Sequence, residues 1–360
     1  MFNLVYNSNS LFDSFILSQR QSSWKCSSQK YEYNLLRNVF KTKAELETGA
    51  YQQKAFYEFD LNERGKHRHI KSLHISDRVI QRSFCDNSLV PIVKNKLAYD
   101  NGASVKHKGI SFARRRLAIH LRKYFNKFGS EGYILQIDFK KFFDSIPHDK
   151  LKQIFKSLLD EKEYKLFCSL IETFNDGDNK SIGIGSQISQ ICGVFYPTVI
   201  DNYFKIVKGC KYYGRYMDDT YIIHHNKEYL KSLLSDYIAL ANRYGLTVNL
   251  KKTHIVKLSH GITFLKIKYN LLADGTILKR LPREVVVRER RKLKKYRKLI
   301  DEKRLSLDVV FNAYKSWRGT YKKFNSHNTI RQMDKLFNSL FGGIYERRKK
   351  TRNFDKNQLS

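Results

Sequence analysis

The chain has 360 residues, and its 68 Lys and Arg against 34 Asp and Glu give a formal net charge of +34. With 41% apolar and 14% aromatic residues it can fill a packed core, which excludes a disordered basic tail. So large a charge opposes compaction unless a polyanion neutralises it, which predicts a nucleic acid as partner and leaves an anionic membrane surface as the alternative.

The absence of long apolar runs and the spacing of the cysteines predict where the protein acts. No run of eighteen apolar residues and no secretory signal occurs, so we expect no membrane partner and a cytoplasmic protein. The five cysteines are widely spaced and form no Cys-x-x-Cys pair. They predict free thiols, and neither a zinc ribbon nor a disulfide framework.

The predicted elements alternate between basic helices and short apolar strands. Residues 66–84 read as an extended basic segment that passes into a helix near Ser76, a plausible N-cap. A basic helix follows over 109–128. Further along the chain we predict strands over 133–137, 212–215, 220–223, 247–250 and 262–267, and helices over 148–174, 189–207 and 227–244. A dense basic helix begins after Lys279, and aromatic residues at helical spacing after it are expected to pack between helices.

Two acidic centres lie far apart in the sequence, each at the end of a predicted strand. Asp138 follows the apolar run 133–137, and Asp218 and Asp219 lie between two strands. Mg²⁺ prefers oxygen ligands, and a pair of such ions can activate a 3′-hydroxyl and stabilise a leaving pyrophosphate. The pattern predicts two Mg²⁺ ions (Mn²⁺ could replace them) bridged by Asp138 and Asp218, with Asp219 as an accessory ligand. An ordinary hairpin turn is the alternative for the Asp218–Asp219 pair.

Ordered motifs over residues 60–330 resemble a bacterial reverse transcriptase of the group II intron-related lineage. The motifs are Lys66-His67-Arg68-His69-Ile70, Ile137-Asp138-Phe139-Lys140-Lys141-Phe142-Phe143-Asp144-Ser145-Ile146, Ile184-Gly185-Ser186-Gln187-Ile188-Ser189-Gln190, Tyr216-Met217-Asp218-Asp219, Tyr244-Gly245-Leu246-Thr247-Val248-Asn249-Leu250-Lys251-Lys252-Thr253 and Gly261-Ile262-Thr263-Phe264-Leu265. The resemblance implies an α+β right-hand polymerase with an antiparallel palm sheet and a helical thumb. Residues 1–128 would be fingers with an N-terminal extension, 129–278 the palm with finger helices inserted around 148–180, and 279–360 a basic helical thumb and tail.

The resemblance also assigns roles to single residues. Asp138, Phe139, Asp218 and Asp219 would hold the metal ions, with the three aspartates as catalytic residues. The nucleotide-binding residues would be Lys66, Arg68, Phe139, Phe143, Gly185, Gln190 and Lys252, with Phe143 as a steric gate against a 2′-hydroxyl. The primer and template contacts would be Tyr216, Met217, Phe264, Leu265, Arg291 and Lys295. Without the motif context, Lys66 and Arg68 would be a solvated basic strand, Phe143 a core residue and Lys252 a surface lysine.

The function implied is RNA-directed DNA synthesis from dNTPs on a dedicated non-coding RNA, giving a DNA product or an RNA–DNA hybrid. The setting would be a bacterial or phage retroelement or an antiphage defence system. Ile184 stands where a glutamine is usual, a form that resembles diversity-generating retroelements and their error-prone copying. The rival interpretation is a non-catalytic RNA-binding scaffold on a polymerase fold. An accessory protein or a homo-oligomer stays open as a further partner.

Overall fold

The computed structural model describes residues 2–20, 22–63, 66–175 and 177–357, with the backbone alone for residues 63, 66 and 343–357. Two compact units make up the chain, one formed by Met1–Leu117 with Leu135–Ile255 and the other by Ala118–Ile134 with Val256–Ser360. The predicted limits of fingers, palm and thumb stay predictions, because compactness alone does not define those subdomains.

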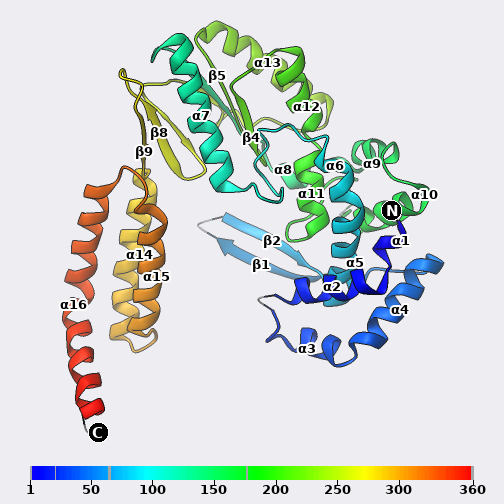
Figure 1. Cartoon of the computed structure of the whole chain (residues 1–360), viewed down its shortest axis with the longest axis horizontal. Coiled ribbons are helices and arrows are strands. Elements are labelled where there is room, and N and C mark those ends of the chain that lie inside the picture. Colours follow the sequence, from blue (N-terminus) through cyan, green and yellow to red (C-terminus); the bar gives the residue numbers. More distant parts are fainter. Residues whose placement is uncertain (1, 21, 64–65, 176, 358–360) are drawn as a thin grey trace. The chain divides into compact units, whose positions relative to one another are not determined.

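The first unit begins with short helices (Figure 1): α1 (Phe2–Val5), α2 (Ser8–Gln19), α3 (Cys26–Tyr33) and α4 (Leu35–Thr48). Apolar residues of α2 and α4, such as Leu11, Phe15 and Val39, are buried. Helix α4 ends at Gly49, whose φ of 73° is the left-handed conformation that glycine adopts without a Cβ clash. The N-terminal segment is therefore a packed part of the unit.

An antiparallel hairpin follows, formed by β1 (Tyr57–Glu63) and β2 (Lys66–Ser72). Helix α5 (Ile75–Phe84) continues into the π-helical turn η1 (Cys85–Leu89) and α6 (Val90–Lys94). The predicted N-cap Ser76 is wrong, because α5 begins at Ile75 and His74 precedes it. The His74 ring accepts a hydrogen bond from the backbone N–H of Ser76 at 3.3 Å.

The central sheet has four strands in the order β4-β5-β3-β6. They are β3 (Tyr133–Ile137), β4 (Tyr213–Tyr216), β5 (Asp219–His224) and β6 (His254–Lys257). The helices between and around them are α7 (Ile110–Phe128), α8 (Phe142–Ser145), α9 (His148–Lys156), α10 (Glu161–Glu172), α11 (Gln187–Phe195), α12 (Thr198–Asn202) with the π-helical turn η2 (Tyr203–Val207), and α13 (Lys227–Arg243). The predicted strands at 133–137, 212–215 and 220–223 and the predicted helices are confirmed.

Two strand predictions are wrong in part. In place of a strand over 247–250, only Val248 makes a bridge, to Phe139, since the chain turns back where Lys252 and Thr253 donate to the Asn249 carbonyl. The predicted strand 262–267 is interrupted at Leu265 and Lys266, whose φ values of 48° and 67° form a tight turn. The turn separates β7 (Ile262–Phe264) from β8 (Ile267–Leu271).

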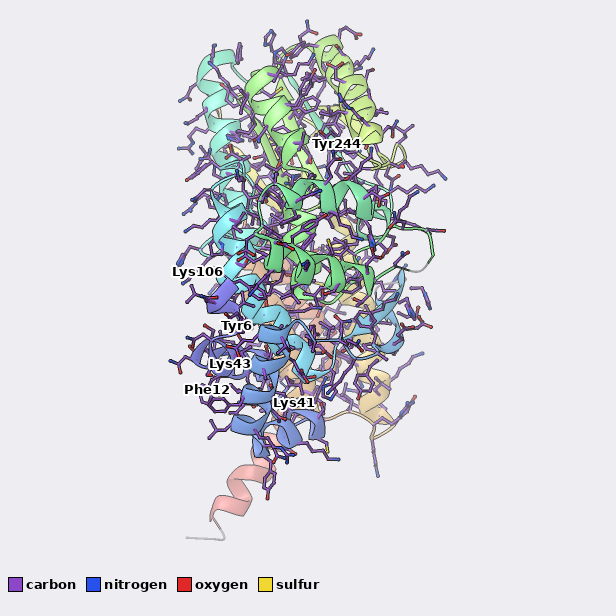
Figure 2. All side chains as sticks on the ribbon, turned by 90° about the vertical axis from the view of Figure 1, so that its right-hand side faces the viewer. Tyr6, Phe12, Lys41, Lys43, Lys106 and Tyr244 are labelled. Carbon is purple, nitrogen blue, oxygen red and sulfur yellow. The ribbon has the colours of Figure 1, made fainter. Side chains whose placement is uncertain are left out.

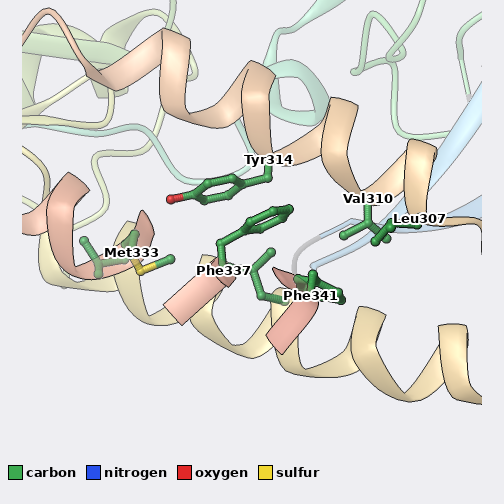
Figure 3. Close-up of a cluster of buried hydrophobic side chains, with 8 residues drawn as sticks. Leu307, Val310, Tyr314, Met333, Phe337 and Phe341 are labelled. Atoms are coloured by element: carbon green, nitrogen blue, oxygen red, sulfur yellow. The ribbon is translucent and has the colours of Figure 1, made fainter. Parts of the chain in front are cut away.

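After Val256, the second unit contains the antiparallel sheet β7-β8-β9, with β9 at Ile277–Arg280, followed by helices. The helices are α14 (Arg283–Asp301), α15 (Leu307–Tyr321) and α16 (His327–Asn357). Figure 3 shows their shared core, where the rings of Tyr314 and Phe337 stack with centroids 4.4 Å apart. The aromatic residues of α15 serve in helix packing, as the spacing predicted.

All five cysteines are free thiols. Cys85, Cys192 and Cys210 are buried, Cys168 is half-buried and Cys26 is exposed. Burial raises the pKa of Cys85 and Cys192, and raises that of Cys210 to about 11. Within the described ranges, no helix combines the length and the apolar character needed to cross a membrane.

Candidate active site

Asp138 follows directly after β3 and is almost buried, with 8% of its surface exposed. The Lys252 ammonium donates hydrogen bonds to both carboxylate oxygens, to Oδ1 at 3.0 Å and to Oδ2 at 3.1 Å. The side-chain amide of Asn249 donates to Oδ1 at 3.1 Å. Asp138 and Lys252 were predicted for separate roles, and the fold brings them into contact.

The segment that carries Lys252 is fastened beside Asp138 by main-chain bonds. The Asn249 N–H donates to the Asp138 carbonyl at 2.8 Å, and the Lys140 N–H donates to the Thr247 carbonyl at 2.8 Å. The Asp138 N–H reaches the Thr253 hydroxyl at 3.4 Å. These bonds hold the segment beside the main chain of Asp138, and they explain why it turns and does not continue as a strand.

Strands β4 and β5 form the hairpin that carries the other two aspartates. Tyr216 pairs with Asp219, so Met217 and Asp218 make a two-residue turn, with Met217 at a φ of 55°. Strand β5, which begins at Asp219, is the neighbour of β3 in the sheet. The sheet therefore places the two predicted acidic centres on adjacent strands. Tyr216, Met217, Asp218 and Asp219 are each half-buried.

A buried ion pair stabilises this turn. Arg215 is 1% exposed, and its guanidinium lies 2.6 Å from the carboxylate of Asp201, which is fully buried. The same guanidinium donates to the carbonyls of Met217 at 3.1 Å and Val194 at 2.8 Å. Burial alone would lower the pKa of Arg215, but the Asp201 carboxylate raises it, so the arginine stays charged. Asn249, Arg215 and Asp201 were missed by the sequence reasoning.

The carboxylates of this site are of a chemical type that binds magnesium, although they do not form a complete coordination sphere. Among the described residues, no three His, Cys, Asp or Glu side chains form a ready cluster for a metal ion. Carboxylate oxygens are nevertheless the preferred ligands of Mg²⁺. Both oxygens of Asp138 already face a cation, the Lys252 ammonium, whose side chain is 52% exposed and can turn away. The donor type of these carboxylates therefore suits a divalent cation, with Lys252 displaced from Asp138.

The two predicted aromatic contacts differ in burial. Phe139 is 3% exposed and stacks on Phe142 with centroids 5.4 Å apart, so only its main chain can face a ligand. Phe143 is half-buried, and its ring lies 3.3 Å from the point where a Cβ on Gly193 would be. Its role as a steric gate stays a prediction.

Gly185 lies in the loop before α11 with a φ of 118°, a conformation that side chains rarely adopt. A Cβ there would come within 3.8 Å of the Lys71 carbonyl, so the loop runs close to β2. Gln190 is exposed on α11, and its amide oxygen lies 3.5 Å from the Ser104 hydroxyl. The nucleotide-binding role of both residues stays a prediction.

Strand β2 carries the two predicted phosphate contacts. Arg68 is exposed and pairs with Leu61 across the hairpin. Lys66 begins the strand, but its side chain lies outside the described residues. Carboxylates of β1 face the histidines of β2, with Asp60 at 3.0 Å and Glu58 at 3.1 Å from the His69 ring.

The second unit holds the other predicted primer and template contacts. Phe264 is 1% exposed, so its ring packs in the core, while Leu265 is half-buried at the tight turn. Lys266 adopts the left-handed conformation, with a φ of 67°. Arg291 and Lys295 are exposed on α14. Arg291 lines a basic groove of about 460 Å³ together with Arg290, Lys294 and Gln332, which suits a phosphate backbone.

Comparison with known proteins identifies the family. Residues 58–269 match the family model described as reverse transcriptase (RNA-dependent DNA polymerase). No curated protein matches the chain. Similar solved structures include apo telomerase from Candida tropicalis truncated from its C-terminal domain, with 17% identity, 68% of this chain and 60% of that chain covered, and a TM-score of 0.47. Another is telomerase from Candida albicans in complex with a TWJ fragment of telomeric RNA, with 12% identity, 81% and 55% covered, and a TM-score of 0.49.

This chain spans 49–60% of the telomerase chains. The family model covers more than half of this chain, and the mixed fold with antiparallel sheets agrees with it. The chain therefore has the right-hand polymerase fold and belongs to the reverse transcriptase (RNA-dependent DNA polymerase) family.

Proposed function

We propose that the protein is an RNA-directed DNA polymerase that extends a primer 3′ end with dNTPs. The observation that carries the proposal is the arrangement of the aspartates. Asp138 directly follows β3, Asp219 begins the neighbouring strand β5, and Asp218 lies in a turn held by the Arg215–Asp201 pair. Transfer of a nucleotidyl group needs carboxylates in fixed positions, because a displaced ligand loses the alignment of the reacting groups.

Each residue has a defined part in this proposal. Asp138, Asp218 and Asp219 would hold two Mg²⁺ ions, which supply activation of the primer hydroxyl and stabilisation of the leaving pyrophosphate. Lys252, once released from Asp138, would contact a phosphate or give a proton to the leaving group. Lys66 and Arg68 would bind the triphosphate, one as a point charge and one as a bidentate fork.

The finer setting rests on the sequence. The ordered motifs together support an enzyme of the bacterial group II intron-related lineage, and the motif from Ile184 to Gln190 supports a retroelement setting. An antiphage-defence enzyme with a dedicated non-coding RNA as template is the close competitor. The isoleucine in place of the usual polar residue supports error-prone copying. The net charge of +34 supports an RNA partner, and the free thiols support a bacterial cytoplasmic location.

Asp218→Asn tests the proposal. The purified protein with its retained RNA is given Mg²⁺ and labelled dNTPs, and the product is sequenced beside the bound RNA. Loss of metal ligation removes several kcal/mol of transition-state stabilisation, so we expect synthesis to fall by about two orders of magnitude or more. Asp149→Asn, an exposed carboxylate in the first turn of α9, is the matched control and keeps synthesis.

The same experiment separates the enzyme from the rival scaffold. DNA complementary to the bound RNA, absent with Asp218→Asn, supports the polymerase, and its error pattern reports on fidelity. A parent protein that binds RNA and makes no DNA with a supplied primer and template supports the non-catalytic scaffold.

A further inference from the structure

Helix α8 is tied by its main chain to the segment that leads into α11. The Ile182 N–H donates to the Phe143 carbonyl at 3.1 Å. Phe143 follows Asp138 by five positions, and Gly185 follows Ile182 by three. A Cβ on Gly185 would lie 3.8 Å from the Lys71 carbonyl of β2, the strand that carries the predicted triphosphate contacts. Phe143 therefore belongs to a short element that joins the aspartate after β3 to the loop that approaches β2.

The Phe143 ring rests on buried rings at its inner side. It meets Phe142 edge-on, with centroids 5.5 Å apart and planes at 79°. Phe142 is 4% exposed and stacks on Phe139, which packs on Tyr237 with centroids 5.9 Å apart. Phe143 itself is half-buried. Packed rings therefore fix its inner side, and a ligand can reach only its exposed side.

Helix α11 closes a second side of this ring at a glycine. Gly193 is buried in α11, and a Cβ there would lie 3.3 Å from Cε1 and 3.4 Å from Cζ of Phe143. The same Cβ would lie 3.5 Å from Cε1 of Phe142, which is an ordinary contact. The position of the Phe143 ring therefore depends on the methyl group that glycine lacks.

The backbone gives no reason for a glycine at this position. Gly193 is helical, and its φ is not positive. A glycine within a helix is less stable than an alanine, because the unfolded chain loses more conformational freedom. A residue that breaks a local rule in this way points to a constraint from packing or function.

Helix α11 is anchored on both sides of Gly193. The buried Ser189 hydroxyl donates to the Ile182 carbonyl. Figure 2 labels Tyr244, whose carbonyl accepts a hydrogen bond of 2.5 Å from the Tyr196 hydroxyl just after the helix. A Cβ on Gly193 would therefore displace the half-buried Phe143 ring, by a few tenths of an ångström, and not the helix.

We propose that Gly193 is a positioning residue for sugar selection, which sets how far the Phe143 ring projects toward the 2′ position of an incoming nucleotide. With glycine the ring rests against α11, and more space is left at its exposed side than alanine would leave. Repulsion between packed atoms rises steeply, so a small displacement of the ring penalises the extra hydroxyl of a ribose more than a deoxyribose. The inference rests on the proposed function and on Phe143 as the steric gate.

The test measures sugar selection on a supplied primer and template. Incorporation of a single dNTP and of the matching rNTP gives the ratio of the two kcat/KM values for each protein. The variants of the full-length chain are Gly193→Ala, Phe143→Val and the two combined. Gly319→Ala, in α15 where a Cβ would have nothing within 4 Å, is the matched glycine control.

We expect Gly193→Ala to raise the dNTP-to-rNTP ratio by about tenfold, the low end of the effect of one carbon in a packed pocket. Phe143→Val should lower the ratio by about tenfold or more, because it opens space for the 2′-hydroxyl. In the Phe143→Val background, Gly193→Ala should leave the ratio unchanged, since the ring atoms that it displaces are gone. A merely structural glycine would change the thermal stability and would lower the use of both nucleotides equally.

Each outcome decides the inference. A rise with Gly193→Ala that disappears in the Phe143→Val background supports it. A parent that makes DNA upholds the proposed function, and the inference is then overturned by an unchanged ratio in Gly193→Ala, by an equal rise in both backgrounds, or by Phe143→Val with the parent ratio. A parent that makes no DNA overturns the proposed function and the inference with it.

A second pair of variants covers the case in which Gly193→Ala does not fold beside Phe143. Phe143→Leu shortens the side chain and leaves room for the added methyl group, so Phe143→Leu is compared with and without Gly193→Ala. We expect a higher dNTP-to-rNTP ratio in the combined variant, because the methyl group moves the leucine outward. An equal ratio in the two proteins would overturn the inference.

Discussion

The two hairpins of the first unit are held in opposite ways. In β4–β5 the residues below the turn are buried, and the Arg215–Asp201 pair ties the Met217 carbonyl to the core. In β1–β2 the side chains are largely exposed, and histidines and carboxylates on the surface make the cross-strand contacts. Burial and a closed network fix the strand end where chemistry is proposed, whereas the hairpin with few buried contacts can open at small cost.

Removing the buried arginine should have the largest effect. Arg215→Leu leaves the Asp201 carboxylate buried without its partner, which costs about 3–5 kcal/mol of unfolding free energy. Urea unfolding measures the loss. Lys231→Ala, which breaks an exposed pair with Glu228 at 2.9 Å, is the control and should be nearly neutral. Arg215→Leu combined with Asp201→Leu should recover part of the loss, and a single substitution as mild as the control would show that the pair does not brace the turn.

Adding a side chain to Gly214 in the β4–β5 hairpin should have an intermediate effect on stability. A Cβ on Gly214 would lie 2.5 Å from the Tyr221 hydroxyl oxygen, so Gly214→Ala should destabilise the fold by about 1–3 kcal/mol. A Cβ on Gly319 in α15 would have nothing within 4 Å, and Gly319→Ala should leave stability equal or higher. Thermal unfolding of the two variants, with Gly214→Ala plus Tyr221→Leu to remove the clashing ring, checks the prediction. Equal stability of both alanine variants would contradict it.

Breaking the Lys252–Asp138 ion pair should have a smaller effect, which we expect in the Mg²⁺ concentration that synthesis requires. An ion pair with a half-exposed lysine is worth about 0.2–1 kcal/mol, so Lys252→Met should lower the Mg²⁺ concentration for half-maximal synthesis by up to about fivefold. If Lys252→Met also lowers the rate of synthesis at saturating Mg²⁺, Lys252 contacts a phosphate or transfers a proton during the reaction. Lys251→Met, the neighbouring lysine, is the control, and an unchanged Mg²⁺ requirement in Lys252→Met would show that the ammonium does not compete with the ion.

The exposed hairpin should respond to pH with the smallest effect. The hydrogen bond to Asp60, followed by that to Glu58, raises the pKa of His69, and the bond to His69 lowers the pKa of Asp60. The His69 contribution is complete below its unfolded pKa of about 6.5 and is lost as pH rises through the higher folded value. The Asp60 contribution is complete above its unfolded pKa of about 3.9 and is lost as pH falls through the lower folded value.

Hydrogen exchange of the β1–β2 amides should therefore be slowest between about pH 4 and pH 6.5, after correction for intrinsic rates. NMR titration of the His69 ring gives its pKa directly. Asp60→Asn should lower that pKa, and a ring that titrates identically in both proteins would refute the surface pairing. The His67 ring lies 3.5 Å from Asp60, and His67→Gln separates its contribution.

Local patterns predicted most of the regular structure and the main acidic residues. The strand Tyr133–Ile137 has the predicted limits because its apolar run is short and β-prone, and the helix over 227–244 follows its amphipathic spacing. The motif that gave Asp218 and Asp219 also gave their hairpin. These features depend on neighbouring residues, and sequence carries that information directly.

The features that the sequence did not predict depend on contacts between residues that are distant in the chain. Thr247–Leu250 has strand-forming residues, yet its main chain binds Asp138 and turns, so tertiary bonds outweigh propensity. The Arg215–Asp201 pair joins residues 14 positions apart across two elements, and no spacing rule reveals it. Asn249 lies within the motif that supplied Lys252, so its amide was the one missed partner of Asp138 with a signal in the sequence.

The contrast among the cysteines gives the protein a built-in reporter. Thiolate is the reactive form of cysteine, so the buried thiols with raised pKa resist alkylation at neutral pH. Cys26 is exposed at the start of α3. A maleimide fluorophore would attach there first in the unaltered chain. Its emission could then report on the surroundings of the N-terminal helices while synthesis is recorded separately.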